Sequence, residues 1–418
     1  MEKYKLGDIA TVEISGVDKK MQDGEKEIRL CNFVDVYYNW AITVAQHDSF
    51  MLATARPNEI SRFQLKKGQV ALTKDSETRD DIGISTYIAD DFDDVILGYH
   101  CALITPNKDI LYGRYLNALL QTDYAKKYFA CNASGSGQRY ALSIEALNSL
   151  PVPVIPLQEQ KRIGEIFSAL DKKIELNKRI NQNLETMAKQ VYDYWFVQFD
   201  FPNKDGKPYK SSGGEMIWNE KLKRMIPKEW TNANIYQLAS ISKETVNPQA
   251  RPNELFKHYS LPEYDKTGTY AEEYGIDVQS AKFIVTNNCI LVSKLNPWTS
   301  RVICGNRESN QICSTEFVVW NPVSLKTKGF LFMLAKSVKF IEYCTQGATG
   351  TSHSHRRINP ELMMKFDFPY NSEIAIKFSL LIENIIVHLH NNIAQLKVLT
   401  KQRDELLPLL MNGQIIIE

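Results

Sequence analysis

The sequence of this chain repeats itself at a constant offset, the one that takes Ala133 to Ala348 (the repeat offset). The stretch ASGSGQRYALSIEAL (Ala133–Leu147) aligns without a gap with ATGTSHSHRRINPEL (Ala348–Leu362). Both stretches begin with a small turn that is rich in glycine and hydroxyl side chains. Self-similarity at a fixed offset indicates that one structural unit occurs twice. We therefore expect a tandem duplication, which limits the possible folds to two copies of one architecture.

Each repeat is expected to end in a long amphipathic helix. Residues 156–196 contain one interior glycine, Gly164, and their apolar residues recur with a heptad period. Residues 371–412 repeat this pattern at the same offset. The seam positions are Ile163, Leu170, Leu184 and Val191 in the first helix, and Phe378, Ile385, Leu399 and Leu406 in the second.

Two asparagines, Asn177 and Asn392, interrupt the two seams at equivalent positions. The economical arrangement is that the helices pair with each other as an antiparallel coiled coil, with Asn177 opposite Asn392. A polar residue at one seam position fixes the register of a coiled coil at some cost in stability. The alternative is that the two asparagines lie exposed on separate helices.

The segments before the helices contain short strand-like runs and no long helical period. Together with the punctuation by Gly, Asn, Asp and Pro, this predicts α+β domains with a mixed or antiparallel sheet. The expected strands lie at 9–14, 70–73, 95–97 and 101–104, and at 284–285, 290–293, 301–304 and 317–320; a short helix around 111–129 parallels one at 330–343. The expected division is 1–155 (first domain), 156–196 (first helix), 197–229 (a connector with little core of its own), 230–370 (second domain), 371–412 (second helix) and 413–418 (tail).

The composition argues against several classes of protein. The chain has 50 Lys and Arg against 49 Asp and Glu, which argues against a non-specific polyanion binder but leaves room for a reader with local basic groups. Its 7 dispersed cysteines form no CxxC pair, so they predict reduced thiols. No signal peptide and no membrane-spanning run are evident, which predicts a cytoplasmic protein with no membrane partner.

No catalytic pattern is evident in the sequence. The turn Gly135–Gln138 lacks the lysine and the spacing of a phosphate-binding P-loop, and Asn296-Pro297-Trp298 lacks one proline of the adenine methyltransferase tetrad. His353 and His355 have no acidic or cysteine neighbour that would complete a metal site. We therefore expect a chain that is not an enzyme by itself and that carries no metal and no cofactor.

The repeated turns are the best candidates for binding nucleic acid. Glycine and small hydroxylated residues let a backbone approach phosphate, while Arg, Gln and His reach phosphates or base edges. The competing interpretation, a plain loop leading into a helix, is equally open. The candidate DNA-binding residues are Lys74, Arg79, Ser134, Ser136, Gln138, Arg139 and Tyr140 in the first domain, and Lys294, Trp298, Arg301, Thr349, Thr351, His353, His355, Arg356 and Arg357 in the second.

Three stretches resemble a known family. They are LPVPVIPLQEQKRIGEIFSALDKKIE (150–175), YDYWFVQFDFPNKDGKPYKSSGGEMIWNEKLKRMIPKEW (192–230) and LLPLLMNGQIIIE (406–418). They are similar to the conserved regions of the specificity subunit of Type I restriction–modification systems, and the resemblance covers the whole chain. The second copy departs from the pattern, because FDFPYNSEIAIKF replaces the stretch that contains Glu159 and Gln160.

The resemblance implies a subunit that reads double-stranded DNA without catalysing a reaction. Each target-recognition domain would read one half of a bipartite, asymmetric site, and the helices would set the spacing between the halves. They would also dock two methyltransferase subunits, which carry S-adenosylmethionine, in a complex for DNA methylation and phage defence that two restriction or translocase subunits can join. Two alternatives stay open: a coiled-coil adaptor with no DNA contact, and the specificity subunit of a Type II-like enzyme.

Overall fold

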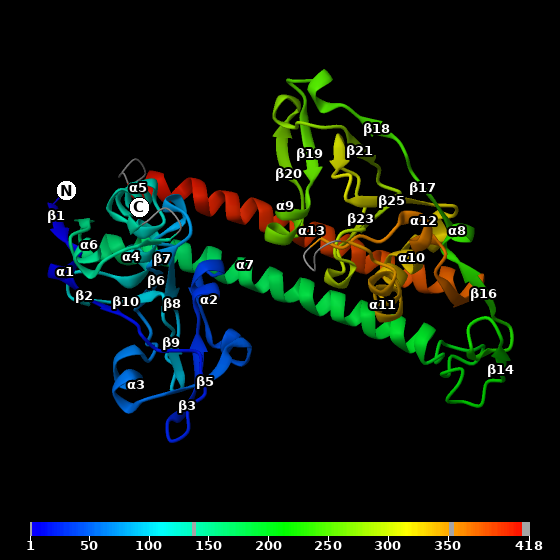
Figure 1. Cartoon of the computed structure of the whole chain (residues 1–418), viewed down its shortest axis with the longest axis horizontal. Coiled ribbons are helices and arrows are strands. Elements are labelled where there is room, and N and C mark those ends of the chain that lie inside the picture. Colours follow the sequence, from blue (N-terminus) through cyan, green and yellow to red (C-terminus); the bar gives the residue numbers. More distant parts are fainter. Residues whose placement is uncertain (1, 136–138, 351–354, 412–418) are drawn as a thin grey trace. The chain divides into compact units, whose positions relative to one another are not determined.

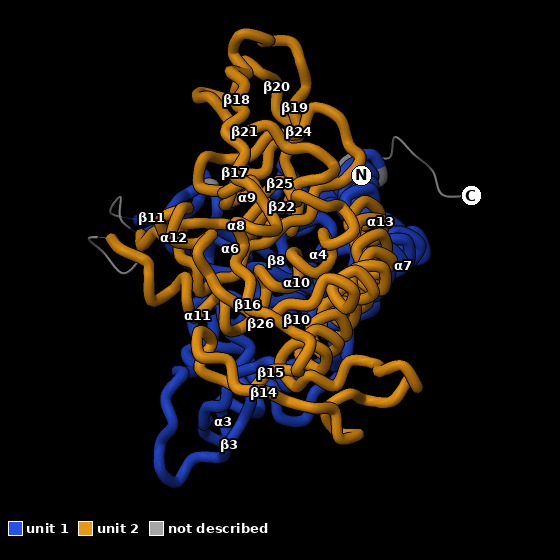
Figure 2. Tube along the Cα trace, turned by 90° about the vertical axis from the view of Figure 1, so that its right-hand side faces the viewer, with its two compact units in different colours: residues 1–176, 397–418 blue, residues 177–396 orange. Residues whose placement is uncertain are grey.

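The computed structural model describes residues 2–135, 139–350 and 355–411 (Figure 1). It divides into two compact units: unit 1 comprises residues 1–176 and 397–418, and unit 2 comprises residues 177–396 (Figure 2). The two long helices are α7 (Leu157–Tyr192), which continues into a π-helical turn, and α13 (Ser372–Met411). Within the described ranges, no helix is long and apolar enough to cross a membrane.

Unit 1 contains an α+β domain with two main sheets. The larger has the order β2 (Ala10–Ile14), β10 (Cys101–Pro106), β6 (Val70–Thr73), β8 (Ser85–Ile88) and β4 (Ala41–Ile42). The smaller has the order β5 (Met51–Ala55), β3 (Lys26–Cys31) and β9 (Val95–Leu97), and β1 (Glu2–Lys5) pairs with β13 (Pro151–Val154). The first two sheets are mixed, because β4 with β8 and β3 with β9 are parallel pairs.

Unit 2 contains the second α+β domain. One sheet has the order β17 (Ala239–Ile241), β25 (Phe317–Pro322), β22 (Ile290–Ser293) and β23 (Val302–Cys304). Another has the order β18 (Thr245–Val246), β21 (Lys282–Val285), β24 (Gln311–Cys313), β19 (Leu255–Tyr259) and β20 (Ala271–Tyr274). At the edge of the domain β16 (Thr231–Asn234) pairs with β26 (Asp367–Tyr370).

The two domains share one topology, which confirms the expected fold class. The β6–β10 pair recurs as β22–β25, and the parallel β3–β9 pair recurs as β19–β24. The terminal pair β1–β13 recurs as β16–β26. The short helices repeat as well: α1 (Leu6–Ile9) and α6 (Ile144–Asn148) in unit 1, and α8 (Ile235–Leu238) and α12 (Pro360–Met364) in unit 2.

Each single helix expected after the sheet is in fact a pair of helices. Residues 113–132 form α4 (Gly113–Leu120) and α5 (Asp123–Asn132), and residues 328–346 form α10 (Lys328–Ala335) and α11 (Val338–Gln346). The hydroxyls of Thr122 and Ser337, which are equivalent at the repeat offset, accept the backbone N–H groups of Ala125 and Phe340. A side-chain cap of this kind starts a new helix, so the break is built into both copies.

The long helices pack in antiparallel fashion within each unit. In unit 1, Ile163 and Phe167 from the start of α7 are buried, and Leu406 from the end of α13 packs against the same core. In unit 2, Tyr192 at the end of α7 meets Phe378 near the start of α13, with ring centroids 5.9 Å apart. Most of the expected seam residues, such as Ile163, Phe378 and Leu406, therefore pack into or against the core of a unit.

The buried seam asparagine has a different partner from the expected one. Asn177 donates from Nδ2 to Oε1 of Gln395 at 3.2 Å, and Gln395 lies one helical turn beyond Asn392. The side chain of Asn392 is half-buried, and the expected contact between the two asparagines is replaced by this amide pair. The helices thus lie about one turn away from the register that equal seam midpoints had suggested.

In each unit a glycine lets the domain approach its long helix closely. The glycine belongs to the long helix in unit 1 and to the domain in unit 2. In unit 1, a Cβ on Gly164 of α7 would lie 3.0 Å from Cβ of Arg114. In unit 2, a Cβ on Gly329 of α10 would lie 3.0 Å from Cα of Ser379 of α13. Arg114 and Gly329 are equivalent at the repeat offset, as are Gly164 and Ser379. Both copies therefore keep this close contact, but the glycine lies on the long helix in the first copy and on the domain helix in the second.

The connector contributes more to the core than its Gly-, Lys- and Ser-rich composition suggested. Phe199 and Phe201 are buried, and both pack against Trp230, with ring centroids 5.4 Å and 5.1 Å apart. The hairpin of β14 (Met216–Asn219) and β15 (Arg224–Pro227) follows them. The aromatic residues of this segment therefore belong to the core of unit 2.

His390 links α13 to the second domain and should make the stability of unit 2 depend on pH. Its Nε2 lies 3.1 Å from the carbonyl oxygen of Cys304, and burial lowers the pKa of the imidazole from its ordinary value of 6.5. As the pH falls below about 6.5, the unfolded chain takes up a proton that the folded state resists, so the free energy of unfolding falls with the pH. Chemical denaturation should show this slope reduced in His390→Gln and unchanged in His388→Gln, a variant at an exposed position of the same helix.

Candidate nucleic-acid interface

In unit 1 the repeated turn forms a hairpin beside the end of β6. Strand β11 (Ser134–Gly135) pairs with β12 (Tyr140–Ala141), and β12 pairs with β7 (Asp75–Ser76). The N–H of Leu142 donates to the carbonyl oxygen of Lys74 at 2.8 Å. These bonds place the exposed Arg139 and half-buried Tyr140 next to Lys74, so three predicted residues share one surface.

A chain of polar contacts runs across this surface from Lys74 to Arg139. Lys74 Nζ donates to the carboxylate of Asp75 at 2.9 Å, and His100 Nδ1 bonds to the other oxygen of that carboxylate. Arg139 Nη2 lies 3.2 Å from His100 Nε2, so this nitrogen accepts and Nδ1 carries the proton. Burial would raise the pKa of Asp75, but the bonds from Lys74 and His100 outweigh burial and lower it. The carboxylate therefore stays charged and orients His100 toward Arg139.

The turn between β6 and β8 completes this surface. It contains the short helix η2 (Arg79–Asp81), and the guanidinium of Arg79 lies 5.1 Å from the centre of the Tyr140 ring. Tyr37 of α2 (Phe33–Tyr38) donates its hydroxyl to the carboxylate of Asp81 at 2.7 Å. That hydrogen bond raises the pKa of Tyr37 to about 12. The η2 turn is thus joined to the hairpin on one side and to α2 on the other.

Unit 2 repeats the backbone framework of this surface. The N–H of Lys294 donates to Glu316 O at 2.9 Å, and Ile358 N–H donates to Lys294 O at 3.0 Å. Lys74 makes the same two bonds with the equivalent residues of unit 1. The candidate loop of unit 2 therefore meets the sheet at the equivalent place.

The side chains on this shared framework differ from those of unit 1. Arg357 makes a two-bond ion pair with Glu316, with Nε to Oε2 at 2.9 Å and Nη2 to Oε1 at 3.0 Å. Thr349 and Arg357 exchange two backbone hydrogen bonds, and the N–H of Arg356 donates to Asn296 Oδ1 at 3.1 Å. His355 is exposed, and it is the first described residue of the segment that leads to Arg356 and Arg357.

The turn between β22 and β23 presents Trp298. This turn contains the short helix η6 (Pro297–Thr299), and the residues on both sides, Asn296 and Ser300, have φ of 48° and 49°. Non-glycine residues rarely adopt this left-handed conformation, and such strain is held by surrounding contacts. Trp298 remains 43% exposed at the tip, a size and exposure suited to contact with a ligand.

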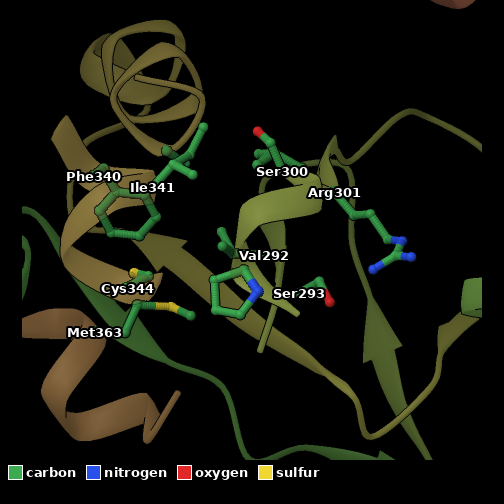
Figure 3. A pocket seen from close by; sticks show the side chains of 11 residues that line it. Val292, Ser293, Ser300, Arg301, Phe340, Ile341, Cys344 and Met363 are labelled. Carbon is green, nitrogen blue, oxygen red and sulfur yellow. The ribbon is translucent and has the colours of Figure 1, made fainter. Parts of the chain in front are cut away.

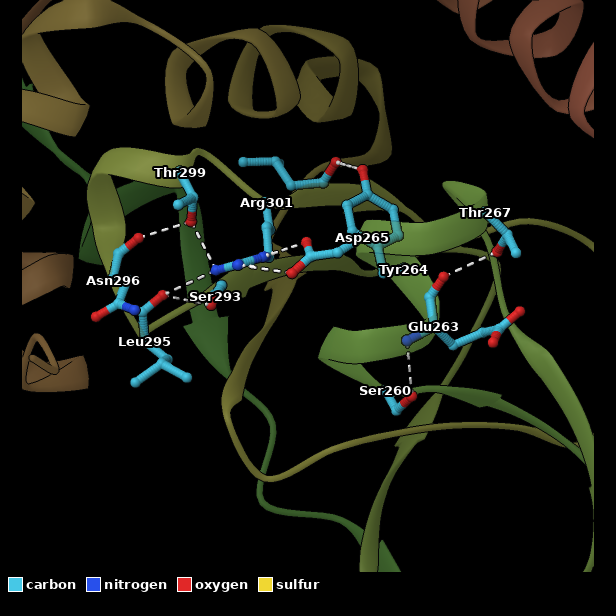
Figure 4. Close-up of polar contacts among 11 residues, drawn as sticks. Ser260, Glu263, Tyr264, Asp265, Thr267, Ser293, Leu295, Asn296, Thr299 and Arg301 are labelled. Atoms are coloured by element: carbon cyan, nitrogen blue, oxygen red, sulfur yellow. Dashed lines mark hydrogen bonds and ion pairs between the residues drawn. The ribbon is translucent and has the colours of Figure 1, made fainter. Parts of the chain in front are cut away.

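Arg301, also a predicted DNA-binding residue, is held by partners within unit 2. Its guanidinium makes two bonds to Asp265 of α9 (Leu261–Thr267), at 2.6 Å and 2.7 Å (Figure 4). It also donates to the Thr299 hydroxyl at 2.6 Å and to the Leu295 carbonyl at 3.4 Å. Only 14% of its side chain is exposed, so its donors serve the η6 turn itself.

The structure thus brings most candidate residues into one surface in each unit. Ser136, Gln138, Thr351 and His353 lie outside the described residues. Sequence reasoning missed the residues that orient these surfaces, namely Tyr37, Asp75, Asp81, His100, Asp265, Asn296 and Glu316. Their local sequence carries no motif, and only the fold brings them to the candidates. Across the described part of the chain, no group of three or more His, Cys, Asp or Glu is arranged to hold a metal ion.

Comparisons with known proteins agree with these features. A family model described as the Type I restriction modification DNA specificity domain matches residues 1–186. The HindI specificity subunit of a Type I restriction enzyme from Haemophilus influenzae is 24% identical over 406 residues, covering 84% of this chain and 87% of that protein. The MjaIX specificity subunit from Methanocaldococcus jannaschii is 23% identical over 325 residues, covering 74% and 71%.

A solved structure shows the same fold over nearly the whole chain. It is the crystal structure of a Type I restriction–modification S subunit from M. genitalium, with a TM-score of 0.58 at 13% identity. The match covers 98% of this chain and 95% of that one. The chain is thus similar in sequence to specificity subunits of Type I restriction enzymes, and it has the fold of a solved S subunit.

Proposed function

We propose that this chain reads a bipartite, asymmetric site in double-stranded DNA, with one half-site read by each domain. The observation that carries this proposal is the contrast between a repeated framework and different side chains. Lys74 and Lys294 hold the same backbone position, yet Arg139 and His100 surround one, and Arg357 and Glu316 surround the other. Two domains with the same backbone framework but different surface side chains would recognise two different half-sites.

The long helices supply the second part of the proposal. They set the spacing between the half-sites and dock two methyltransferase subunits, which bring S-adenosylmethionine and the chemistry; restriction or translocase subunits join that complex. Helices α7 and α13 carry large apolar side chains that are at least one-third exposed, as a docking face for protein would. These are Leu176, Ile180 and Met187 on α7, and Leu380, Val387 and Val398 on α13.

The near-neutral charge of the chain is consistent with a complex in which other subunits neutralise much of the DNA phosphate charge. With 50 basic and 49 acidic residues, this subunit supplies little general attraction to phosphate. Several arginines at the surfaces are also neutralised locally, such as Arg357 by Glu316. The chain therefore contributes selectivity, and its partners contribute much of the phosphate neutralisation.

The test is to map methylated adenines after co-expression with the neighbouring methyltransferase in a host that lacks adenine methylation. We expect a split motif with one modified adenine in each half. Arg139→Ala and Arg356→Ala should each weaken binding to that motif by roughly tenfold, as for loss of one phosphate or base contact. Lys126→Ala and Lys339→Ala, at exposed helix positions outside the candidate residues, serve as matched controls.

The opposite result has an equally clear meaning. A stable complex with the methyltransferase that modifies no defined motif would reject DNA reading and leave the coiled-coil adaptor as the function. Equal losses in all four variants would show that general charge, and not the two surfaces, governs binding.

A further inference from the structure

We propose that two contacts, Asp265 with Arg301 in unit 2 and Tyr37 with Asp81 in unit 1, are positioning contacts that set how strictly each half-site is discriminated. Each contact holds the turn that presents side chains to DNA. The inference rests on the proposed DNA-reading function and deepens it. It also gives Arg301 the role of a positioning residue in place of a DNA contact.

The two contacts occupy equivalent places in the two domains. Helix α2 follows β3, which pairs in parallel with β9, and helix α9 follows β19, which pairs in parallel with β24. The η2 turn joins the antiparallel strands β6 and β8, and the η6 turn joins β22 and β23. In both domains one polar contact therefore connects the same helix to the same turn.

The chemistry of the two contacts is different. In unit 1 the carboxylate belongs to the turn, as Asp81, and the helix supplies the hydroxyl of Tyr37. In unit 2 the carboxylate belongs to the helix, as Asp265, and Arg301 follows the turn. Because unlike residues make a connection at the same place, the connection itself is the repeated feature.

The η6 turn packs on α11 on one side and is joined to α9 by the polar contact of Arg301 on the other. Pro297 and Ser300 line a pocket together with Phe340, Ile341 and Cys344 of α11 (Figure 3). Arg301 restrains the opposite side of the turn, since its four bonds join the turn at Thr299 and Leu295 to the helix at Asp265.

A loosened turn should lose discrimination more than affinity. Trp298 sits on the η6 turn and Arg79 on the η2 turn, so each contact governs one reader. A mismatched base pair costs a well-placed domain about 5- to 150-fold in affinity, and that preference depends on fixed geometry. Backbone contacts from the rest of the domain would persist, so binding to all sequences would change little.

The experiment compares affinities for three duplexes in the presence of the partner methyltransferase. One duplex carries the mapped motif, and the others carry one base-pair change in the first or the second half-site. Asp265→Asn should reduce discrimination at the second half-site about tenfold and leave the first within about twofold, the scale of one lost base preference. Tyr37→Phe should reduce discrimination at the first half-site and leave the second nearly unchanged. Glu254→Gln, which breaks the exposed Arg251–Glu254 pair in the same domain, is the matched control.

Two further variants separate positioning from folding. Asp265→Glu retains the carboxylate and should keep most of the discrimination, and Thr299→Val removes only the hydroxyl and should weaken it partly. An equal loss of affinity for all three duplexes in Asp265→Asn, or discrimination left intact in both Asp265→Asn and Tyr37→Phe, would overturn this inference alone. A wild-type protein that discriminates neither half-site would overturn the proposed function and this inference together.

Discussion

Replacing Gln160 of α7 by leucine is expected to destabilise unit 1 strongly. The side chain of Gln160 is fully buried in the first turn of that helix. Its Oε1 accepts the N–H of Tyr112 at 2.9 Å, and its Nε2 donates to Ile110 O at 2.9 Å and Ile155 O at 2.8 Å. Leucine has a similar volume but would leave three buried backbone groups without partners.

The expected size follows from the cost of those groups. Each of the three buried polar groups left unpaired costs about 1–3 kcal/mol, so the loss is roughly 3–9 kcal/mol. For a unit of this size, that corresponds to a fall of about 10 °C or more in Tm. Gln158→Leu, at an exposed position two residues earlier, is the matched control and should change Tm by little. Calorimetry showing equal shifts for the two variants would contradict this role of Gln160.

The second copy shows how the same junction is made without this glutamine. Ala375 is the equivalent of Gln160 at the repeat offset, and it is buried. Ser379 instead accepts the N–H of Phe330 at 2.9 Å and donates to Ala375 O at 2.8 Å. The departure of FDFPYNSEIAIKF from the first copy thus has a structural reason. Helix α7 is joined to a loop of its domain by the amide of Gln160, whereas α13 is joined to helix α10 by the hydroxyl of Ser379.

The sequence predicted the large features of the fold because they are periodic. The heptad pattern located both long helices, and residues such as Ile163 and Phe378 are indeed buried. Strands such as β6 and β22 were predicted with their observed bounds. Each is a short run of mostly β-branched and aliphatic residues that is bounded by polar turns. The register of the helices was not predictable, because it depends on where Asn177 finds an amide partner and not on the midpoint of the seam.

The candidate surfaces were predictable only in part. The turn that recurs at the repeat offset identified Arg139, Tyr140 and the arm that contains Arg357. The residues that orient them come from distant strands and helices, as His100 and Asp265 do, and no local pattern marks such partners. The ion pair of Arg301 with Asp265 was not predictable for the same reason, and a DNA contact by Arg301 stays a prediction.

Each domain is expected to read its half-site independently of the other, and a chimera with the second domain in both positions tests this independence. Residues 235–366 would replace residues 6–150, because the pairs Lys5–Pro151 and Asn234–Asp367 end equivalent strand pairs. Gln160→Ala and Gly164→Ser would accompany the exchange, so that Gly329 again meets a serine on the long helix.

The measurement is the methylated motif of the chimera, mapped by single-molecule sequencing beside that of the parent chain. The chimera carries two copies of one DNA-reading domain, so we expect a motif in which the second half-site occurs twice and the first half-site is lost. A folded chimera that still modifies the asymmetric parental motif, or modifies no motif containing the second half-site, would contradict the reading of one half-site by each domain.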